Sequence, residues 1–281
     1  MNHPQFEVLS ASGFCLDALT ALFNRSFAGY LFPVNLSSEG LSHRIRTEDM
    51  DLHASKVVLM DGEPAGLALI ARRGCRSRLA AMGVTEEGRH QGLGRLLTQA
   101  VLTDAMNRKG GGDREMRLEV FEDNIAARKL YEDEGFRVLR RLVGHTLPSP
   151  MAQPASLELH DTPVWNHVVA AESMDLPWQL EPGTLAVLCA PARVASLDGR
   201  AWALIYGSSA EMLMLRGLYV RPEHRREHLA SRLIGALAAM HPGHAIHFPP
   251  LLPESMAEGF FEHLGFQVDA MNQVEMGISF S

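Results

Sequence analysis

The stretch "GRHQGLGRLL", Gly88–Leu97, places two arginines and two closely spaced glycines directly before an apolar helical pattern. A turn that leads into a helix presents unpaired backbone N–H groups and the positive end of the helix dipole, which together attract phosphate. Gly92 and Gly94 leave the backbone bare, and Arg89 and Arg95 add cationic donors. For these residues alone, a flexible turn is the alternative. A dinucleotide fingerprint is disfavoured because the third glycine of GxGxxG is absent.

The pattern around this stretch predicts strands joined in hairpins and then strands alternating with helices. Such an order describes a mixed α/β sheet whose last crossovers are parallel. Apolar spacing and turn residues predict helices over 16–27, 37–50, 93 to the "KGGGD" stop at 109–113, and 125–134. Strands are predicted as a hairpin over 55–73 that turns at Asp61-Gly62, and over 78–85, 114–121 and from 135 onward.

Three prolines lie within the nine residues "LPSPMAQPA", Leu147–Ala155. Proline removes a backbone donor and discourages both helix and sheet, so this stretch reads as a linker near the midpoint of the chain. We therefore expect domains at 1–148 and 156–281, with a linker at 149–155.

An internal repeat relates the two halves. "VTEEGRHQGLGRLL" from Val84 matches "VRPEHRREHLASRL" from Val220 at an offset of 136. "KLYEDEGF" from Lys129 matches "GFFEHLGF" from Gly259 at an offset of 130. The difference of six residues falls between the two blocks, where an insertion is tolerated in a loop. One fold used twice explains the pattern.

Composition excludes several classes of protein. Hydrophobic residues make up 46% of the 281 positions, enough for a sizeable core. The net charge of −7 argues against a nucleic-acid partner, because such affinity depends on neutralising phosphates. No window approaches the roughly 20 apolar residues that span a bilayer, and no leader pattern opens the chain. Cys15, Cys75 and Cys189 are widely spaced, so we expect neither zinc nor disulfides, and a cytoplasmic location.

Taken together, Arg89-x-x-Gly92-x-Gly94, the following helix, the strand "LEVF", Asn124 and "ARKLYEDEGF" resemble the GNAT superfamily of acyl-CoA-dependent N-acetyltransferases. The resemblance is strong over about 55–141 and holds only in outline for the second half. It implies an α/β fold of two GNAT-like domains, each a mixed, mainly antiparallel twisted sheet flanked by helices.

The resemblance also implies a coenzyme A site. The loop would hold the pyrophosphate, and the preceding strand would pair with the pantetheine arm. Asn124 matches a position that contacts the cofactor or a nearby water, and Arg128 would meet the ribose phosphate, with an exposed helix arginine as the alternative. The residues so implied to bind acetyl-CoA are Met82, Gly83, Val84, Arg89, His90, Gln91, Gly92, Leu93, Gly94, Arg95, Asn124 and Arg128.

The implied reaction is attack by a primary amine on a thioester carbonyl, which requires a proton acceptor for the amine and a proton donor for the thiolate. Glu119 is the expected base, directly or through water, because family members place a glutamate twelve residues before the acid tyrosine. Tyr131 is the expected acid. The alternatives are a surface glutamate on an alternating strand and a tyrosine ring that packs under the sheet.

The second copy lacks the same groups. His228 replaces Gly92, Phe261 replaces Tyr131, Pro249 replaces Glu119, and Glu254 replaces Asn124. A catalytically silent, degenerate domain is expected, although Arg225, Arg226 and a helix N-terminus retain some attraction for an anion. In related two-domain enzymes the competent half is typically the second, and this chain departs from that pattern.

We therefore expect an acetyl-CoA-dependent N-acetyltransferase acting on a small-molecule or peptide amine. A coenzyme A-binding sensor or scaffold without turnover, and a transferase for a longer acyl group, are the alternatives. Tyr30 and Phe32 are expected to line the acceptor pocket. His241, His244 and His247 need not converge, because Pro242 and Gly243 break the helical phase, so no metal is expected. The oligomeric state does not follow from the sequence.

Overall fold

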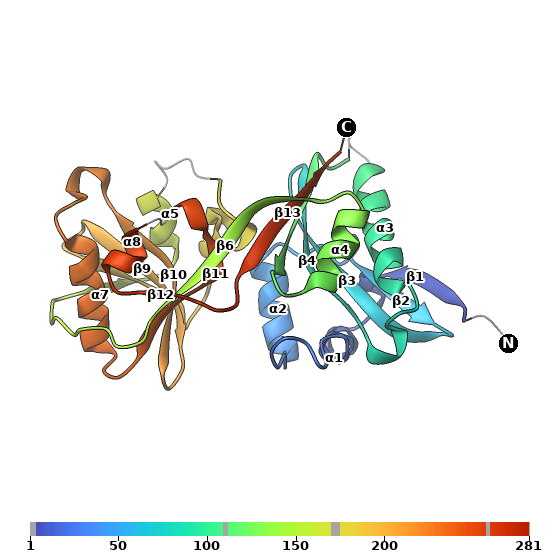
Figure 1. Ribbon diagram of the computed structural model, residues 1–281, viewed down its shortest axis with the longest axis horizontal. Helices are drawn as coiled ribbons and strands as arrows, with labels where there is room; N and C mark the ends of the chain where they lie inside the picture. Colours follow the sequence, from blue (N-terminus) through green and yellow to red (C-terminus); the bar gives the residue numbers. More distant parts are fainter. Residues whose placement is uncertain (1–3, 109–111, 170–174, 257–258, 281) are drawn as a thin grey trace. The chain divides into compact units, whose positions relative to one another are not determined.

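The computed structural model describes residues 4–108, 112–169, 175–256 and 259–280 (Figure 1). The chain forms two compact units. Unit 1 contains Met1–Leu139 and Val274–Ser281, and unit 2 contains Arg140–Gln273. Within unit 1, residues 109–111 of the predicted "KGGGD" stop lie outside the described residues.

Unit 1 is built on a twisted sheet with strand order β1-β2-β3-β4-β5-β13. Neighbouring strands from β1 to β4 are antiparallel, as predicted for the hairpins, and β4 and β5, which α3 connects, are parallel, as predicted for a crossover through a helix. The strands are β1 (Phe6–Ser10), β2 (Lys56–Met60), β3 (Glu63–Arg73), β4 (Arg76–Val84), β5 (Glu115–Phe121) and β13 (Gln273–Ser279).

Among the described residues, four helices flank this sheet, and each lies within a range where the sequence predicts a helix. The core between α3 and the sheet contains Leu97 and Val101 of the helix and Met116 and Leu118 of β5, while α1 contacts β3 and β4. The helices are α1 (Leu16–Ser26), α2 (Ser38–Thr47), α3 (Leu93–Met106) and α4 (Ile125–Asp133), with single 3₁₀ turns η1 (Ala11–Gly13) and η2 (Glu86–Gly88).

The N-terminal strand β1 was absent from the sequence prediction. Its five residues, "FEVLS", are exposed or half-buried, because β1 forms the edge of the sheet and, within the described part of the chain, pairs with β2 alone. A short edge strand carries little of the alternation by which strands are recognised.

Unit 2 repeats the fold. Its strand order is β6-β11-β10-β9-β8-β7, with β12 on the other side of β6, and a core beneath α7 contains Leu233, Leu237 and Phe248. The strands are β6 (Arg137–Leu147), β7 (Glu158–His160), β8 (Arg193–Leu197), β9 (Ala201–Ser208), β10 (Met212–Val220), β11 (Ala245–Pro253) and β12 (Gln267–Val268). The helices are α5 (Pro163–Val169), α6 (Pro182–Leu185), α7 (Leu229–Met240) and α8 (Phe260–His263), with 3₁₀ turns η3 (Trp178–Leu180), η4 (Pro222–His224) and η5 (Glu254–Met256).

The same register occurs in both units. Arg76–Arg78 of β4 pair with Glu115–Arg117 of β5, and Met212–Met214 of β10 pair with Ala245–His247 of β11. These pairs are related by the offsets of 136 and 130 found in the sequence. The fold predicted from the repeat is therefore confirmed.

The units differ from the predicted halves 1–148 and 156–281, because each half gives a strand to the other unit. β6 belongs to the first half, yet from Leu142 to Leu147 it pairs with β11 of unit 2. β13 belongs to the second half, yet it follows β5 in unit 1 and adds Val274 and Met276 to the core beneath α3 (Figure 1). The proline-rich stretch 148–157 contains no helix or strand.

Cleavage of the linker tests this exchange. A protease site inserted at 149–151 cuts no strand or helix. We expect the two fragments to co-elute in size-exclusion chromatography after cleavage, because each sheet contains a strand from the other fragment. Separate elution of two folded fragments would contradict the exchange. The uncleaved insertion variant is the control.

Candidate functional site

The first element of the site is the divergence of β4 from β5. The parallel pairing ends at Arg78 and Arg117, and among the described residues β5 pairs with no part of β4 beyond that point. Met82, Gly83 and Val84 lie on this unpaired length and are bonded on their other side to β3. The edge of β4 that faces away from β3 is therefore available to an extended ligand, and it is the length of strand to which the family resemblance assigns the pantetheine arm.

The second element is the loop before α3. His90 and Gly92 adopt left-handed φ values of 62° and 83°. In the part of the chain that the structure describes, the backbone N–H groups of residues 90–95 donate to no acceptor, whereas the next one, of Leu96, bonds to Gly92. Six neighbouring donors at a helix N-terminus form a site for phosphate oxygens. This loop is the one predicted to hold pyrophosphate.

The two glycines of the loop are required for different structural reasons. Glycine is favoured at position 92 because the backbone there adopts a left-handed φ, whereas a Cβ at this position would meet no atom within 4 Å. A Cβ on Gly94 would lie 3.2 Å from Leu130 Cδ2, so this glycine allows α4 to approach α3.

The predicted cations make hydrogen bonds and ion pairs within the protein. Arg89 donates to the carbonyl of Ala28 at 2.6 Å and to that of Val84 at 3.4 Å. Arg95 pairs with Asp133 at 3.1 Å and Glu134 at 3.0 Å, and Arg128 donates to the carbonyl of Glu122 at 3.2 Å. In unit 2 Arg225 donates to Val220, the equivalent of the Arg89–Val84 bond, at 3.2 Å. The arginine shared by both copies therefore supports the turn.

Tyr131 lies on α4 and is only 6% exposed, with its ring edge-on to Phe136 at 5.8 Å between centroids. Burial raises the pKa of Tyr131 above its ordinary value, and nearby Tyr30 adds to the shift. Phe261 of unit 2 makes the same edge-on contact, with Phe266 at 5.2 Å. The two copies share the ring packing and differ in the hydroxyl.

Asn124 connects two parts of the site. Its Oδ1 accepts from the N–H of Ala127 and caps α4, and its Nδ2 donates to the hydroxyl of Tyr30 at 3.4 Å. Tyr30 and Phe32 contact each other and Phe121 edge-on, with centroids 5.5 to 6.4 Å apart. The two predicted acceptor residues therefore lie together at the end of β5.

Glu119 belongs to a ladder of alternating charges that sequence reasoning missed. The Nη2 of Arg78 lies 2.6 Å from Oε2 of Glu119, and its Nη1 lies 2.7 Å from Oε2 of Glu48. Glu48 in turn pairs with Arg44 at 2.9 Å. The side chains of Arg78, Glu48 and Glu119 are 4%, 8% and 3% exposed, so Glu119 is no surface residue. Only Arg44 and Glu48 are related by helical spacing, four residues apart at the end of α2; no spacing in the sequence connects them with Arg78 of β4 or Glu119 of β5.

The ladder fixes its charges. Burial alone would raise the pKa of Glu48, but the guanidinium groups of Arg44 and Arg78 outweigh it and lower the pKa to about 2. Burial acts to lower the pKa of Arg78, but Glu119 and Glu48 outweigh burial and raise it. At neutral pH Arg78 and Glu48 are therefore both charged.

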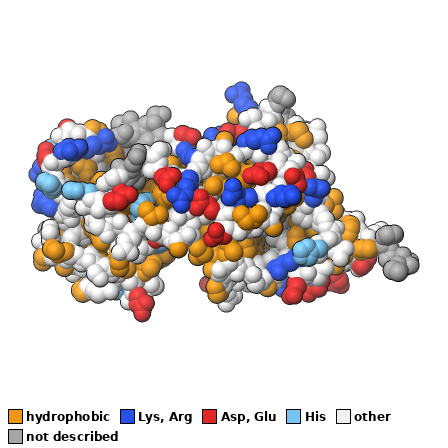
Figure 2. All heavy atoms as spheres, in the orientation of Figure 1, with side chains coloured by type: hydrophobic (Ala, Val, Ile, Leu, Met, Phe, Trp, Pro, Cys, Tyr) orange, Lys and Arg blue, Asp and Glu red, His pale blue; other side chains and the backbone are white. Residues whose placement is uncertain are grey.

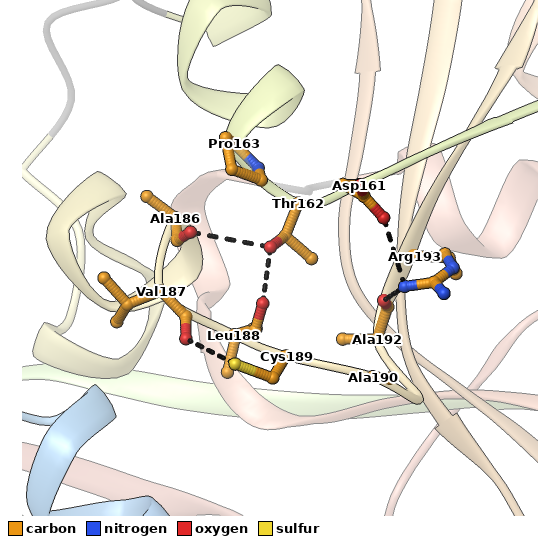
Figure 3. Close-up of a pocket in the computed structure, with 10 residues that line it drawn as sticks. All are labelled: Asp161, Thr162, Pro163, Ala186, Val187, Leu188, Cys189, Ala190, Ala192 and Arg193. Atoms are coloured by element: carbon orange, nitrogen blue, oxygen red, sulfur yellow. Dashed lines mark hydrogen bonds and ion pairs between the residues drawn. The ribbon is translucent and has the colours of Figure 1, made fainter.

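Other clusters do not join this site. In unit 2, residues 161–163, 186–190, 192 and 193 line a pocket of about 300 Å³. Figure 3 shows the Asp161–Arg193 ion pair on one side of the pocket and Cys189 with the Thr162–Leu188 hydrogen bond on the other. No residue predicted for the site lies in that pocket.

The three histidines of the second half serve different contacts. His247 hydrogen-bonds Thr146 at 3.0 Å, while His241 and His244 stack edge-on at 5.6 Å. A search of the described residues finds no group of three or more His, Cys, Asp or Glu side chains placed to hold a metal ion.

Two further properties concern the charge distribution on the surface and the apolar character of the helices. Acidic and basic side chains are interspersed on the face drawn in Figure 2. Among the helices that the structure describes, none combines the length and the apolar composition needed to cross a bilayer.

Substitutions at the equivalent loop positions test the backbone argument. Gly92→Ala should lower the free energy of unfolding by about 1 kcal/mol, because alanine disfavours a left-handed φ. His228→Gly should raise it by about 1 kcal/mol, because His228 adopts a φ of 58°. Urea denaturation measures both, and an unchanged midpoint for both variants would show that the loop conformations differ from those described.

Acid denaturation tests the charge ladder. Because the pKa of Glu48 falls from 4.5 to about 2 on folding, its contribution is complete above 4.5 and is lost as the pH falls toward 2. Glu48→Gln should cost about 3 kcal/mol at neutral pH, and the deficit should shrink across that window. The control is Glu39→Gln, an exposed glutamate in the first turn of α2, the helix after which Glu48 lies. A deficit independent of pH would contradict the ladder.

Comparison with known proteins agrees with this geometry. The model of the Acetyltransferase (GNAT) family matches residues 17–136. The mycothiol acetyltransferase of Jonesia denitrificans is 32% identical over 139 residues, which make up 47% of this chain and 43% of that protein. The match thus spans less than half of that relative's length.

Solved structures resemble the whole chain. A tandem GNAT protein from the clavulanic acid biosynthesis pathway aligns with a TM-score of 0.69 and 15% identity, over 99% of this chain and 98% of that chain. A GCN5-related N-acetyltransferase from Sphaerobacter thermophilus aligns with a TM-score of 0.62 and 14% identity, over 98% and 95%. At these identities the likeness concerns the fold alone. Residues 17–136 therefore match the GNAT acetyltransferase family, and the chain as a whole has a fold similar to that of a tandem GNAT protein.

Proposed function

We propose that unit 1 is an N-acetyltransferase that transfers an acetyl group from acetyl-CoA to a primary amine. The observation that carries the proposal is that the divergence of β4 from β5 and the unpaired N–H groups of residues 90–95 occur within one GNAT-family segment. An extended thioester arm needs the free strand edge, and a pyrophosphate needs the N–H groups.

The cofactor contacts in this proposal come mainly from the backbone. Met82–Val84 hold the pantetheine arm, and His90, Gln91, Gly92, Leu93 and Gly94 hold the pyrophosphate. Arg89, Arg95 and Arg128 contribute by stabilising the loop and α4, and Asn124 by capping α4 and orienting Tyr30, since these are the bonds they make. This assigns the cations a supporting role beside the coenzyme.

The chemistry requires two proton movements. The amine loses a proton as its nitrogen attacks the thioester carbonyl, and the departing thiolate gains one. Glu119 takes the first proton, directly or through water, and its ion pair with Arg78 fixes the carboxylate in place. Tyr131 donates the second, and its raised pKa keeps the phenol protonated until the thiolate forms. Backbone N–H groups of Met82–Val84 stabilise the oxyanion.

Unit 2 is catalytically silent in this proposal. Phe261 has no proton to donate, and Pro249 has no carboxylate. At the loop position where Gly92 has no side chain, unit 2 carries the imidazole of His228.

We propose a cytoplasmic location for the protein. Cys15, Cys75 and Cys189 are all exposed and free, which suits a reducing compartment.

Tyr131→Phe tests the enzyme. Turnover on any accepted amine should fall roughly 100-fold or more, because the acid is lost. The KM for acetyl-CoA and the melting temperature should not change, since Phe261 shows that phenylalanine fits the same ring contacts in unit 2. The measurement is thiol release from acetyl-CoA across an amine panel.

Two outcomes would contradict parts of this proposal. Unchanged turnover would make Tyr131 a packing residue. Coenzyme A binding without thiol release from any amine would favour the sensor or scaffold function. Replacing acetyl-CoA with longer acyl-CoA thioesters in the same assay tests the acyl preference.

A further inference from the structure

The charge ladder ends in an unsatisfied acceptor. Oε2 of Glu119 accepts from both Nε and Nη2 of Arg78, whereas Oε1 is buried and has no hydrogen-bond partner among the described residues. A buried carboxylate oxygen without a donor is costly, because it has lost water and gained nothing in return. A water molecule or a ligand that donates hydrogen bonds would satisfy this oxygen.

The charges select the kind of donor. From the helix side, the ladder runs Arg44, Glu48, Arg78, Glu119, which alternates positive and negative and ends on a negative group. The next complementary group in such a series is a cation. A protonated primary amine supplies both the charge and three N–H donors, whereas an anion would face Glu119 directly.

The neighbouring surface is aromatic. Met116, Leu118 and Val120 of β5 enter the core beneath α3, so by strand alternation Glu119 and Phe121 share the opposite face. Phe121 contacts Tyr30 and Phe32, and Phe32 is 37% exposed. Aromatic faces attract cations and bury apolar groups, so this cluster suits the body of an apolar amine.

The cations beside this position are already engaged. Nε, Nη1 and Nη2 of Arg78 all bond to Glu48 or Glu119, and Arg117 pairs with Glu115 and Glu275. A carboxylate next to the amine, as in an α-amino acid, would therefore meet an aromatic surface and Glu119 in place of a cation.

We propose that the acceptor of this enzyme is a protonated primary amine on an apolar body without an adjacent carboxylate, with its ammonium bound at Oε1 of Glu119 and its body on Tyr30, Phe32 and Phe121. Arg78 is a positioning residue that holds Glu119 through Oε2 and leaves Oε1 for the substrate. This inference rests on the proposed transfer to an amine and names its acceptor class.

Binding without turnover separates the two proposals. Calorimetry on the full chain, without acetyl-CoA so that no turnover occurs, uses three probes of similar size: protonated phenethylamine, the neutral 3-phenylpropan-1-ol, and L-phenylalanine. We expect only the first to bind measurably. Glu119→Gln should weaken that binding by about 10- to 100-fold, because a charged hydrogen bond is lost. Glu115→Gln, on the same strand and face, should leave it unchanged.

Thiol release then ranks the substrates. We expect phenethylamine to exceed L-phenylalanine in kcat/KM by about 10- to 100-fold. Arg78→Met places at this position the residue that unit 2 has at Met214, and it should raise the KM for the amine while the KM for acetyl-CoA stays constant. Arg78→Lys should restore part of the loss. If Arg78→Met fails to fold, the ranking of the amines and the effect of Glu119→Gln on binding still test the inference.

The outcomes are distinct. Turnover with equal preference for phenethylamine and L-phenylalanine overturns the inference and leaves the proposed function standing. Cation binding that depends on Glu119, with no thiol release from any amine, overturns the proposed function and retains the binding site. Binding of the neutral alcohol as tightly as the cation, or binding insensitive to Glu119→Gln, overturns the inference.

Discussion

The divergence of β4 from β5 is the constraint on which the candidate site depends. Parallel pairing ends at Arg78 and Arg117, and directly beyond that point the ion pair from Arg78 to Glu119 connects the two strands. Backbone hydrogen bonds hold the strands together up to this point, and a buried charge pair joins them after it. A free strand edge and a fixed carboxylate thus arise at one place from one change in pairing.

Comparison of the two copies separates what the fold requires from what the chemistry requires. Both units pair their central strands over three equivalent residues and then let them diverge. Both keep the arginine that bonds to the end of the preceding strand, and both keep the edge-on aromatic pair. Unit 2 differs in the hydroxyl of Tyr131, the bare backbone at Gly92, and the Arg78–Glu119 pair, whose equivalents are Met214 and Pro249. Retained groups support the fold, and lost groups are those the proposed reaction needs.

Local patterns predicted the local structure well. The helices of unit 1 begin and end within a few residues of the apolar periodicity, because each buries one stripe against the sheet. The edge strand β1 and the exchange of β6 and β13 were not predicted. The alternation of apolar and polar residues in a strand is the same whether the strand joins the sheet of its own half or the sheet of the other half. The pattern therefore predicts which side chains face the core, but it does not predict which strand is the pairing partner.

By itself, the sequence determined that the chain repeats one fold, that the first copy keeps the loop, the glutamate and the tyrosine, and that the second copy has lost them. These features are local, because each depends on residue type and spacing within a single strand, turn or helix. Only the tertiary structure decided that Arg78 binds both Glu48 and Glu119, that Phe121 completes the cluster of Tyr30 and Phe32, and that the loop arginines bond within the protein. Those contacts join positions dozens of residues apart, and the energy of a buried charge depends on which partners surround it, which spacing along a chain does not encode.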